Sequence, residues 1–60
     1  MTSQDIYSGA HRIGRVEPRG RRFLAFVVDE REGALRPIGT FPTARAAREA
    51  IVSREARHAA

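Results

Sequence analysis

The strongest constraint on the fold is a run of six apolar residues, Phe23 to Val28, near the middle of the chain. The run is far shorter than the roughly 20 apolar residues that a membrane-spanning helix needs. It is followed by a charged stretch, residues 29–33, which ends in glycine. A short apolar run bounded by turn residues is typical of a β-strand. We therefore expect a strand over residues 23–28 and a hairpin connection after it.

A first strand is predicted before this run, over residues 11–17, with Ile13 and Val16 as its β-branched anchors. The segment 18–20, Pro-Arg-Gly, follows it with turn chemistry, since proline fixes φ and glycine accepts positive φ. Gly14 interrupts the strand. A glycine at such a position indicates a bulge or a close approach of another backbone.

A third strand is predicted over residues 35–41, where Pro37 favours an edge position because proline cannot donate to a ladder. The pattern then changes to that of a helix. Thr43 is a good N-cap, since its hydroxyl can accept a hydrogen bond from an amide of the first turn. Small and apolar residues at helical spacing give the helix one packed face, formed by Ala44, Ala46, Ala47, Ala50 and Ile51.

These elements predict an α+β fold, a three-stranded antiparallel sheet packed on one C-terminal helix (βββα) in two layers. Residues 11–60 would form this single domain. Residues 1–10, with Ile6 and Tyr7 as their apolar content, are expected to be a flexible N-terminal arm.

Composition argues against an enzyme or a cofactor protein. The chain has 60 residues and no cysteine, which excludes disulfides and zinc–thiolate sites. His11 and His58 lie near opposite ends without metal-ligand spacing, and no catalytic motif is present, so we expect no metal, no cofactor and no small-molecule substrate. There is also no apolar stretch of membrane-spanning length and no secretory signal, which predicts a cytoplasmic protein without membrane contact.

Charge is the main compositional indication of function. The formal net charge is +4, and all 11 basic residues are arginine. Arginine suits phosphate and guanine through its bidentate fork, although a GC-rich genome would also favour arginine codons. Five arginines gather on the first strand and its turn, where they would contact phosphates or simply decorate a solvated edge: Arg12, Arg15, Arg19, Arg21 and Arg22.

One stretch has a family resemblance. Gly20-Arg21 is followed by an aromatic residue at Phe23, the segment 38–44 reads IGTFPTA, and the helix carries an alanine pair at positions 46 and 47. Residues 20–50 thereby resemble the DNA-binding domain of the plant ethylene-response-factor type and, more loosely, the arm-binding domains of tyrosine integrases. The resemblance implies a three-stranded sheet that reads DNA with the face turned away from the helix, and a prophage or regulatory accessory role.

Carried over to this sequence, the DNA-contacting positions of the family fall on two kinds of residue. Arg12 and Arg15 keep the chemistry on the first strand. The positions on the second and third strands are apolar and cannot hydrogen-bond a base edge or a phosphate through their side chains: Phe26, Val28, Leu35 and Pro37.

The apolar run also supports a different surface. Alternation places Phe23, Ala25 and Val27 on one side of the strand, and one helix can cover only one side of the sheet. The other side would carry an exposed apolar surface, formed by Leu24, Phe26, Val28 and Leu35. A homodimer or a protein partner could cover it, the N-terminal arm could fold back as a lid, or a bulge could redistribute the side chains.

Two hypotheses for function follow. The first is a nucleic-acid-binding accessory protein that contacts phosphates through the arginine cluster, with DNA expected in preference to RNA. The alternative is a protein-interaction module, acting as a homodimer, adaptor or inhibitor through the apolar sheet face, with an acidic protein as one expected partner. The two can coexist in a dimer that presents its arginines to DNA.

Overall fold

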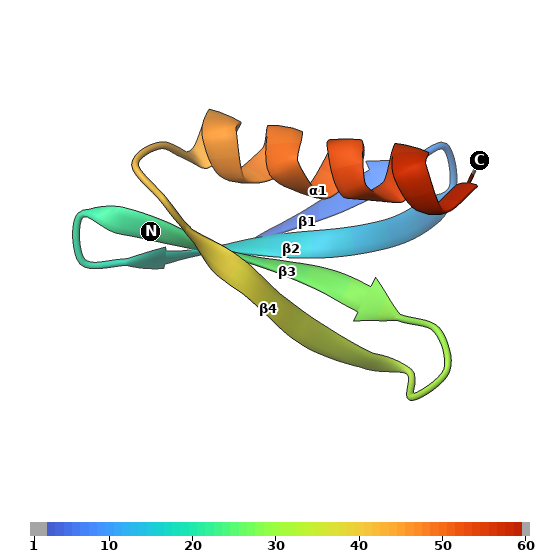
Figure 1. The fold of residues 1–60 in the computed structure, drawn as a ribbon. Helices are drawn as coiled ribbons and strands as arrows, with labels where there is room; N and C mark the ends of the chain where they lie inside the picture. The colour runs from blue at the N-terminus through green and yellow to red at the C-terminus, as the bar shows by residue number, and fades with distance from the viewer. Residues whose placement is uncertain (1–2, 60) are drawn as a thin grey trace.

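The computed structural model describes the backbone of residues 3–59 and the side chains of residues 3–56; the side chain of His58, considered above as a metal ligand, lies outside this part. Four strands precede one helix: β1 (Gln4–Ser8), β2 (His11–Arg19), β3 (Arg22–Asp29), β4 (Ala34–Phe41) and α1 (Ala44–Ala59). The strands form one antiparallel sheet in the order β1-β2-β3-β4. Helix α1 lies along one side of the sheet, which gives two layers (Figure 1).

The α+β class is confirmed, but the prediction of three strands was wrong. Within residues 1–10, which we expected to form an arm, Gln4–Ser8 is a strand paired with β2. Two features hold it there. Gly9, with a φ of 63°, opens a two-residue turn between Ser8 and His11, and glycine in that first position suits a tight hairpin. Ile6, only 5% exposed, joins the core.

The second hairpin turns at Gly20 and Arg21 rather than at the predicted residues 18–20. Arg19 pairs with Arg22, and Gly20 between them has a φ of 59°. Strand β2 therefore continues through Pro18. The proline is tolerated because the pairing of β2 with β1 ends at Val16, so no ladder hydrogen bond is lost on that side.

The third connection is held by Asp29. Its carbonyl oxygen accepts a hydrogen bond from the amide of Gly33 at 2.7 Å, and its side-chain Oδ1 accepts one from the amide of Arg31 at 3.0 Å. This is the polar hairpin loop that the sequence predicts. Strand β4, which follows, lies at an edge of the sheet, as Pro37 indicated.

The core lies between the sheet and α1. Ile51 is the large side chain with no exposed surface, and Ala25 and Ala47 are also fully buried, so that helix and strand approach closely. Ile13 and Ile38 are each the extra residue of a β-bulge, and both contribute to the helix side of the sheet. The complete buried cluster is Ile6, Ile13, Val16, Ala25, Ala47 and Ile51.

Ile51 of the helix packs directly against Gly14 of β2. A Cβ atom at this position would lie 2.7 Å from Cγ2 of Ile51 and would collide with the carbonyl oxygen of Phe26. Both expectations for Gly14 are thus confirmed, since it stands beside a bulge and beneath a close contact.

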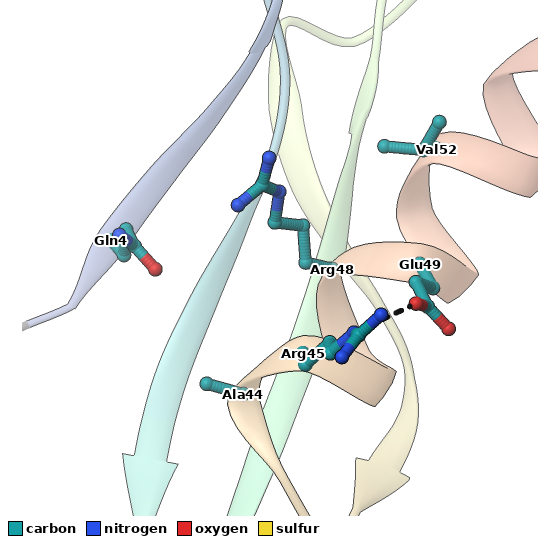
Figure 2. A pocket seen from close by; sticks show the side chains of 6 residues that line it. All are labelled: Gln4, Ala44, Arg45, Arg48, Glu49 and Val52. Carbon is teal, nitrogen blue, oxygen red and sulfur yellow. Dashed lines mark hydrogen bonds and ion pairs between the residues drawn. The ribbon is translucent and has the colours of Figure 1, made fainter.

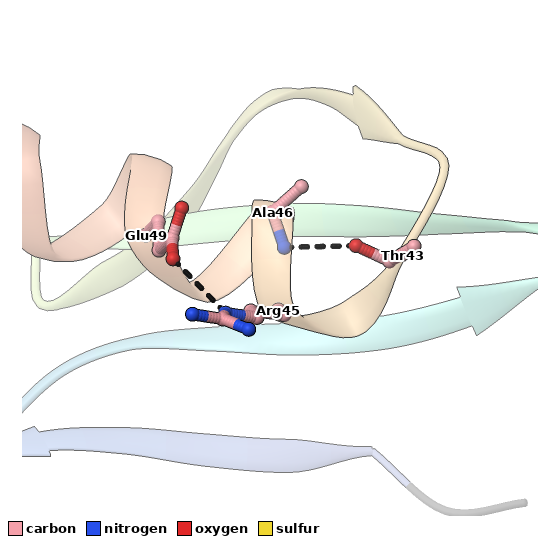
Figure 3. A network of polar contacts seen from close by, with 4 residues as sticks. All are labelled: Thr43, Arg45, Ala46 and Glu49. Atoms are coloured by element: carbon pink, nitrogen blue, oxygen red, sulfur yellow. Dashed lines mark hydrogen bonds and ion pairs between the residues drawn. The ribbon is translucent and has the colours of Figure 1, made fainter.

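The start of α1 is fixed by Thr43. Its Oγ1 accepts a hydrogen bond from the amide of Ala46 at 3.0 Å, which confirms the predicted N-cap (Figure 3). One turn further on, Arg45 Nε donates to Oε1 of Glu49 at 3.2 Å. Within the described residues, no helix has the length and apolar character needed to cross a lipid bilayer.

Candidate functional site

The side of the sheet opposite α1 is here called the open face. Ala25 of β3 and its partner Val16 of β2 are both buried under the helix. Because side chains alternate along a strand, Leu24 and Phe26 point to the other side. Over residues 3–59, no helix or strand lies across that side (Figure 1).

An apolar patch occupies the middle of the open face. Phe26 pairs with Pro37, and Val28 pairs with Leu35 across β3 and β4. None of these side chains belongs to the set that packs against the core; Pro37 is exposed and the others are half-buried. The apolar patch consists of Leu24, Phe26, Val28, Leu35 and Pro37.

The strand pairing bears on two of the three alternatives for this side of the sheet, the bulge and the N-terminal lid. The bulge between Ala25 and Phe26 leaves the alternation of β3 intact, because the extra residue is Ile38 on β4. Residues 3–10, the described part of the expected arm, form no lid over the patch. They extend the sheet sideways, with Ile6 in the core and Tyr7 57% exposed.

Four of the five predicted arginines lie on the open face beside this patch. Arg15 pairs with Phe26, and Arg19 pairs with Arg22, which alternates with Leu24 along β3. Arg12 faces the same carboxylate, that of Asp5, as Arg15 does. We call Arg12, Arg15, Arg19 and Arg22 the strand arginines. The fifth, Arg21, lies in the turn between β2 and β3.

Asp5 of β1 ties two of the strand arginines together. Its Oδ1 lies 3.5 Å from Nε of Arg12 and 3.7 Å from Nε of Arg15, and all three side chains are about 40% exposed. One carboxylate thus faces two guanidinium groups, so this cluster keeps a net charge of about +1. The distance of 3.7 Å is too long for a hydrogen bond, so Arg15 Nε has an ion-pair neighbour but no hydrogen-bond acceptor in the described part of the chain.

The other three predicted arginines have no acidic partner among the described residues. Arg22 donates from Nε to Oγ1 of Thr40 at 3.3 Å and from Nη2 to its carbonyl oxygen at 3.4 Å. Arg19 and Arg21 are exposed and have no ion pair or side-chain hydrogen bond among the described residues. The open face carries four arginines against Asp5 and Glu17, an excess of two positive charges, to which Arg21 at its end adds a third.

Two aromatic rings, those of Tyr7 and Phe26, also lie on the open face. Alternation in the sequence assigned Phe26 to this surface but not Tyr7. Tyr7 pairs with Arg12, and Phe26 pairs with Arg15. Directly opposite residues in a sheet have Cβ atoms about 5 Å apart, so each ring has an arginine as its cross-strand neighbour. Tyr7 and Asp5 were missed because their segment was expected to be an arm.

A second polar region lies between α1 and β1. An open groove there is lined by Arg45 and Arg48 of the helix, by Gln4 of β1, and by Ala44, Glu49 and Val52 (Figure 2). Arg45 is already paired with Glu49 at 3.2 Å, and the described residues that line the groove include no aromatic side chain. It offers less positive charge and no stacking surface, so the open face is the stronger candidate.

The described residues also bear on metal binding. They contain no group of three or more histidine, aspartate or glutamate side chains that could hold a metal ion. His11 Nε2 lies 3.9 Å from Oε1 of Glu30, and both side chains are about 80% exposed. A single exposed pair of this kind does not form a coordination site.

The arrangement can therefore bind anionic groups and apolar or aromatic surface side by side. The family resemblance of residues 20–50 stays a prediction, because no family model, no curated protein and no solved structure matches this chain.

Proposed function

We propose that the protein is a small nucleic-acid-binding module, not an enzyme, which contacts phosphates through the arginines of its open face. The observation that carries the proposal is the convergence of the four strand arginines on the one side of the sheet that α1 leaves uncovered. Guanidinium groups bind phosphate bidentately, and the net charge of +4 favours an acidic partner.

The same face argues for weak sequence preference. Base recognition in a groove requires side chains that hydrogen-bond base edges. On β3 and β4 the open face offers Leu24, Phe26, Val28, Leu35 and Pro37 instead. Binding would then depend mainly on phosphate contacts and would weaken as salt rises. DNA is the expected nucleic acid, in the role of an accessory or regulatory protein.

A charge-matched pair of variants tests the proposal. The first replaces Arg19, Arg21 and Arg22 with alanine. The second replaces three arginines outside the open face, in the β3–β4 loop and on α1, and so makes the same change in net charge: Arg31, Arg48 and Arg54. Both are titrated with a labelled mixed-sequence DNA at several salt concentrations.

The open-face variant should lose affinity and lower the slope of log K against log salt by about 2–3, since each phosphate contact contributes about 0.7–0.9. The control variant should retain most of the slope of the natural protein. Equal losses in the two variants would mean that only net charge matters. Absence of binding at low salt would contradict the proposal outright.

A second candidate function is favoured by the apolar patch. Contiguous apolar surface that solvent can reach commonly marks a protein interface, and the patch, though half-buried at most of its residues, is of this kind. A homodimer, adaptor or inhibitor would use Phe26 near its centre. Mass in solution tests the homodimer form of this function: a dimer that becomes monomeric on Phe26→Asp, while remaining folded, would support it. A folded monomer before and after that substitution would contradict self-association.

A further inference from the structure

We infer that the ligand of the open face is single-stranded nucleic acid, with unpaired bases stacked on Tyr7 and Phe26 and phosphates held by the neighbouring arginines. This inference rests on the proposed function and names its substrate class. It depends on a combination that charge alone does not explain, namely that aromatic rings and arginines share one uncovered surface.

The apolar patch argues against a duplex as the preferred ligand. A duplex presents phosphates and polar groove edges, whose hydrogen-bonding groups lose water when they are covered. Leu24, Phe26 and Val28 cannot replace those hydrogen bonds, so placing them against a groove would be unfavourable. An unpaired base instead exposes a flat π-surface, which stacks well on aromatic side chains.

The register of the sheet gives the spacing that such a strand requires. Tyr7 on β1 and Phe26 on β3 are separated by β2, which carries Arg12 opposite the first ring and Arg15 opposite the second. Two inter-strand spacings put the ring-bearing strands roughly 10 Å apart. Tyr7 and Arg12 lie in one row of the open face, and Arg15 and Phe26 lie in the next row, which Asp5 shares on β1. A chain that crosses the strands diagonally would meet ring, arginine, arginine and ring, an order that suits bases and backbone phosphates.

Charge also makes a nucleic acid a better occupant than a second copy of this chain. In a two-fold dimer the same patch meets itself. Two open faces would then bring the strand arginines of both copies together, with only Asp5 and Glu17 of each copy to offset them. A polyanion avoids this repulsion, because its phosphates are attracted to the same arginines.

The test compares affinities for labelled oligonucleotides of about 12 nucleotides. The probes are a mixed-sequence DNA single strand, the RNA single strand of the same sequence, and a DNA hairpin duplex with the same number of phosphates. The proteins are the natural chain, Tyr7→Ala, Tyr7→Phe and Phe26→Leu. Val52→Ala is the control, because Val52 is an apolar side chain 47% exposed on α1.

The single strands should bind more tightly than the hairpin. Tyr7→Ala and Phe26→Leu should each weaken single-strand binding on the order of fivefold or more, the range found for loss of one base–aromatic stack. Tyr7→Phe keeps the ring and should restore most of the affinity, and Val52→Ala should bind like the natural chain. Circular dichroism shows whether each variant keeps its fold, which is expected at Tyr7 because its side chain is exposed.

The outcomes separate this inference from the proposed function. If the hairpin binds as tightly as the single strands, or if both ring variants bind normally, the inference is wrong while nucleic-acid binding stands. If no probe binds and the protein has the mass of a dimer, the proposed function also fails and the open face is a protein interface. A difference between the DNA and RNA strands identifies which backbone is preferred.

Discussion

Replacement of Asp5 by asparagine should increase the affinity for nucleic acid. Asp5 is the carboxylate that faces both Arg12 and Arg15, at 3.5 and 3.7 Å from their Nε atoms. It holds the two guanidinium groups in place and also competes with any phosphate that approaches them. Asparagine keeps the size of the side chain and removes the charge.

The size of the effect follows from Coulomb's law. A phosphate bound on the outer side of either guanidinium would lie roughly 7 Å from the Asp5 carboxylate, where like charges repel by about 0.6 kcal/mol in a water-like dielectric. Removal of this repulsion at two phosphates would lower the free energy of binding by about 1.2 kcal/mol. Screening at 0.1 M salt reduces the gain by roughly half. The expected gain is therefore roughly threefold in affinity.

The fold should tolerate the change. The side chains of Asp5, Arg12 and Arg15 are about 40% exposed, and ion pairs near the surface contribute only about 0.2–1 kcal/mol each. Thermal unfolding followed by circular dichroism would confirm that the Asp5→Asn protein remains folded at the temperature of the binding assay.

Fluorescence anisotropy with a labelled DNA single strand provides the assay, and Glu55→Gln provides the control. Glu55 is exposed on α1, on the other layer of the fold, so its replacement makes the same change in net charge away from the open face. Asp5→Asn should bind more tightly than Glu55→Gln. Equal affinities for the two variants, or weaker binding by Asp5→Asn, would refute the assignment of Arg12 and Arg15 to phosphate contacts.

Three further predictions concern the fold that presents this face. Gly14→Ala should destabilise the protein by about 1–3 kcal/mol, because the added Cβ would lie 2.7 Å from Cγ2 of Ile51; a thermal midpoint unchanged from that of the natural chain would contradict this contact. Thr43→Ala should lower the free energy of unfolding by about 1 kcal/mol through loss of the N-cap bond to Ala46. Urea unfolding measures this change, and Thr43→Ser should retain most of the stability. Ile6→Ala should cost about 2–5 kcal/mol because Ile6 is a core residue, and an unchanged urea midpoint would mean that β1 is not part of the cooperative fold.

The central strands and the helix could be predicted because their signals are local. The apolar run of residues 23–28, the proline in β4 and the capping threonine each act within a few neighbouring residues, and all three correspond to observed features. Strand β1 depends instead on its pairing with β2. Its five residues contain one buried side chain, Ile6, which is too little for a strand pattern to emerge.

A signal for β1 was nevertheless present in its turn. Gly9-Ala10 between Ser8 and His11 has the same form as Gly20-Arg21 between Arg19 and Arg22, and both glycines have a φ near 60°. A glycine in the first position of a two-residue connection is a hairpin indication. Comparing the two turns would have added the missing strand, and with it Asp5 and Tyr7.

The convergence of the arginines could not be obtained from alternation alone. Arg12 and Arg15 are three residues apart, so a regular strand would place them on opposite sides of the sheet. The bulge at Ile13 adds one residue and brings both to the open face. A bulge depends on pairing with the neighbouring strand, and therefore this part of the site required the three-dimensional structure.

Binding of nucleic acid by the open face is tested most directly by a methyl NMR titration of the natural chain with a DNA single strand. The methyl groups of Leu24, Val28 and Leu35 report on the open face, and those of Val52, exposed on α1, report on the opposite layer. If the open face binds the strand, the open-face methyl signals should shift with increasing DNA while the Val52 signals stay in place. Shifts confined to Val52 and the helix, with the open-face signals unchanged, would contradict binding by the open face.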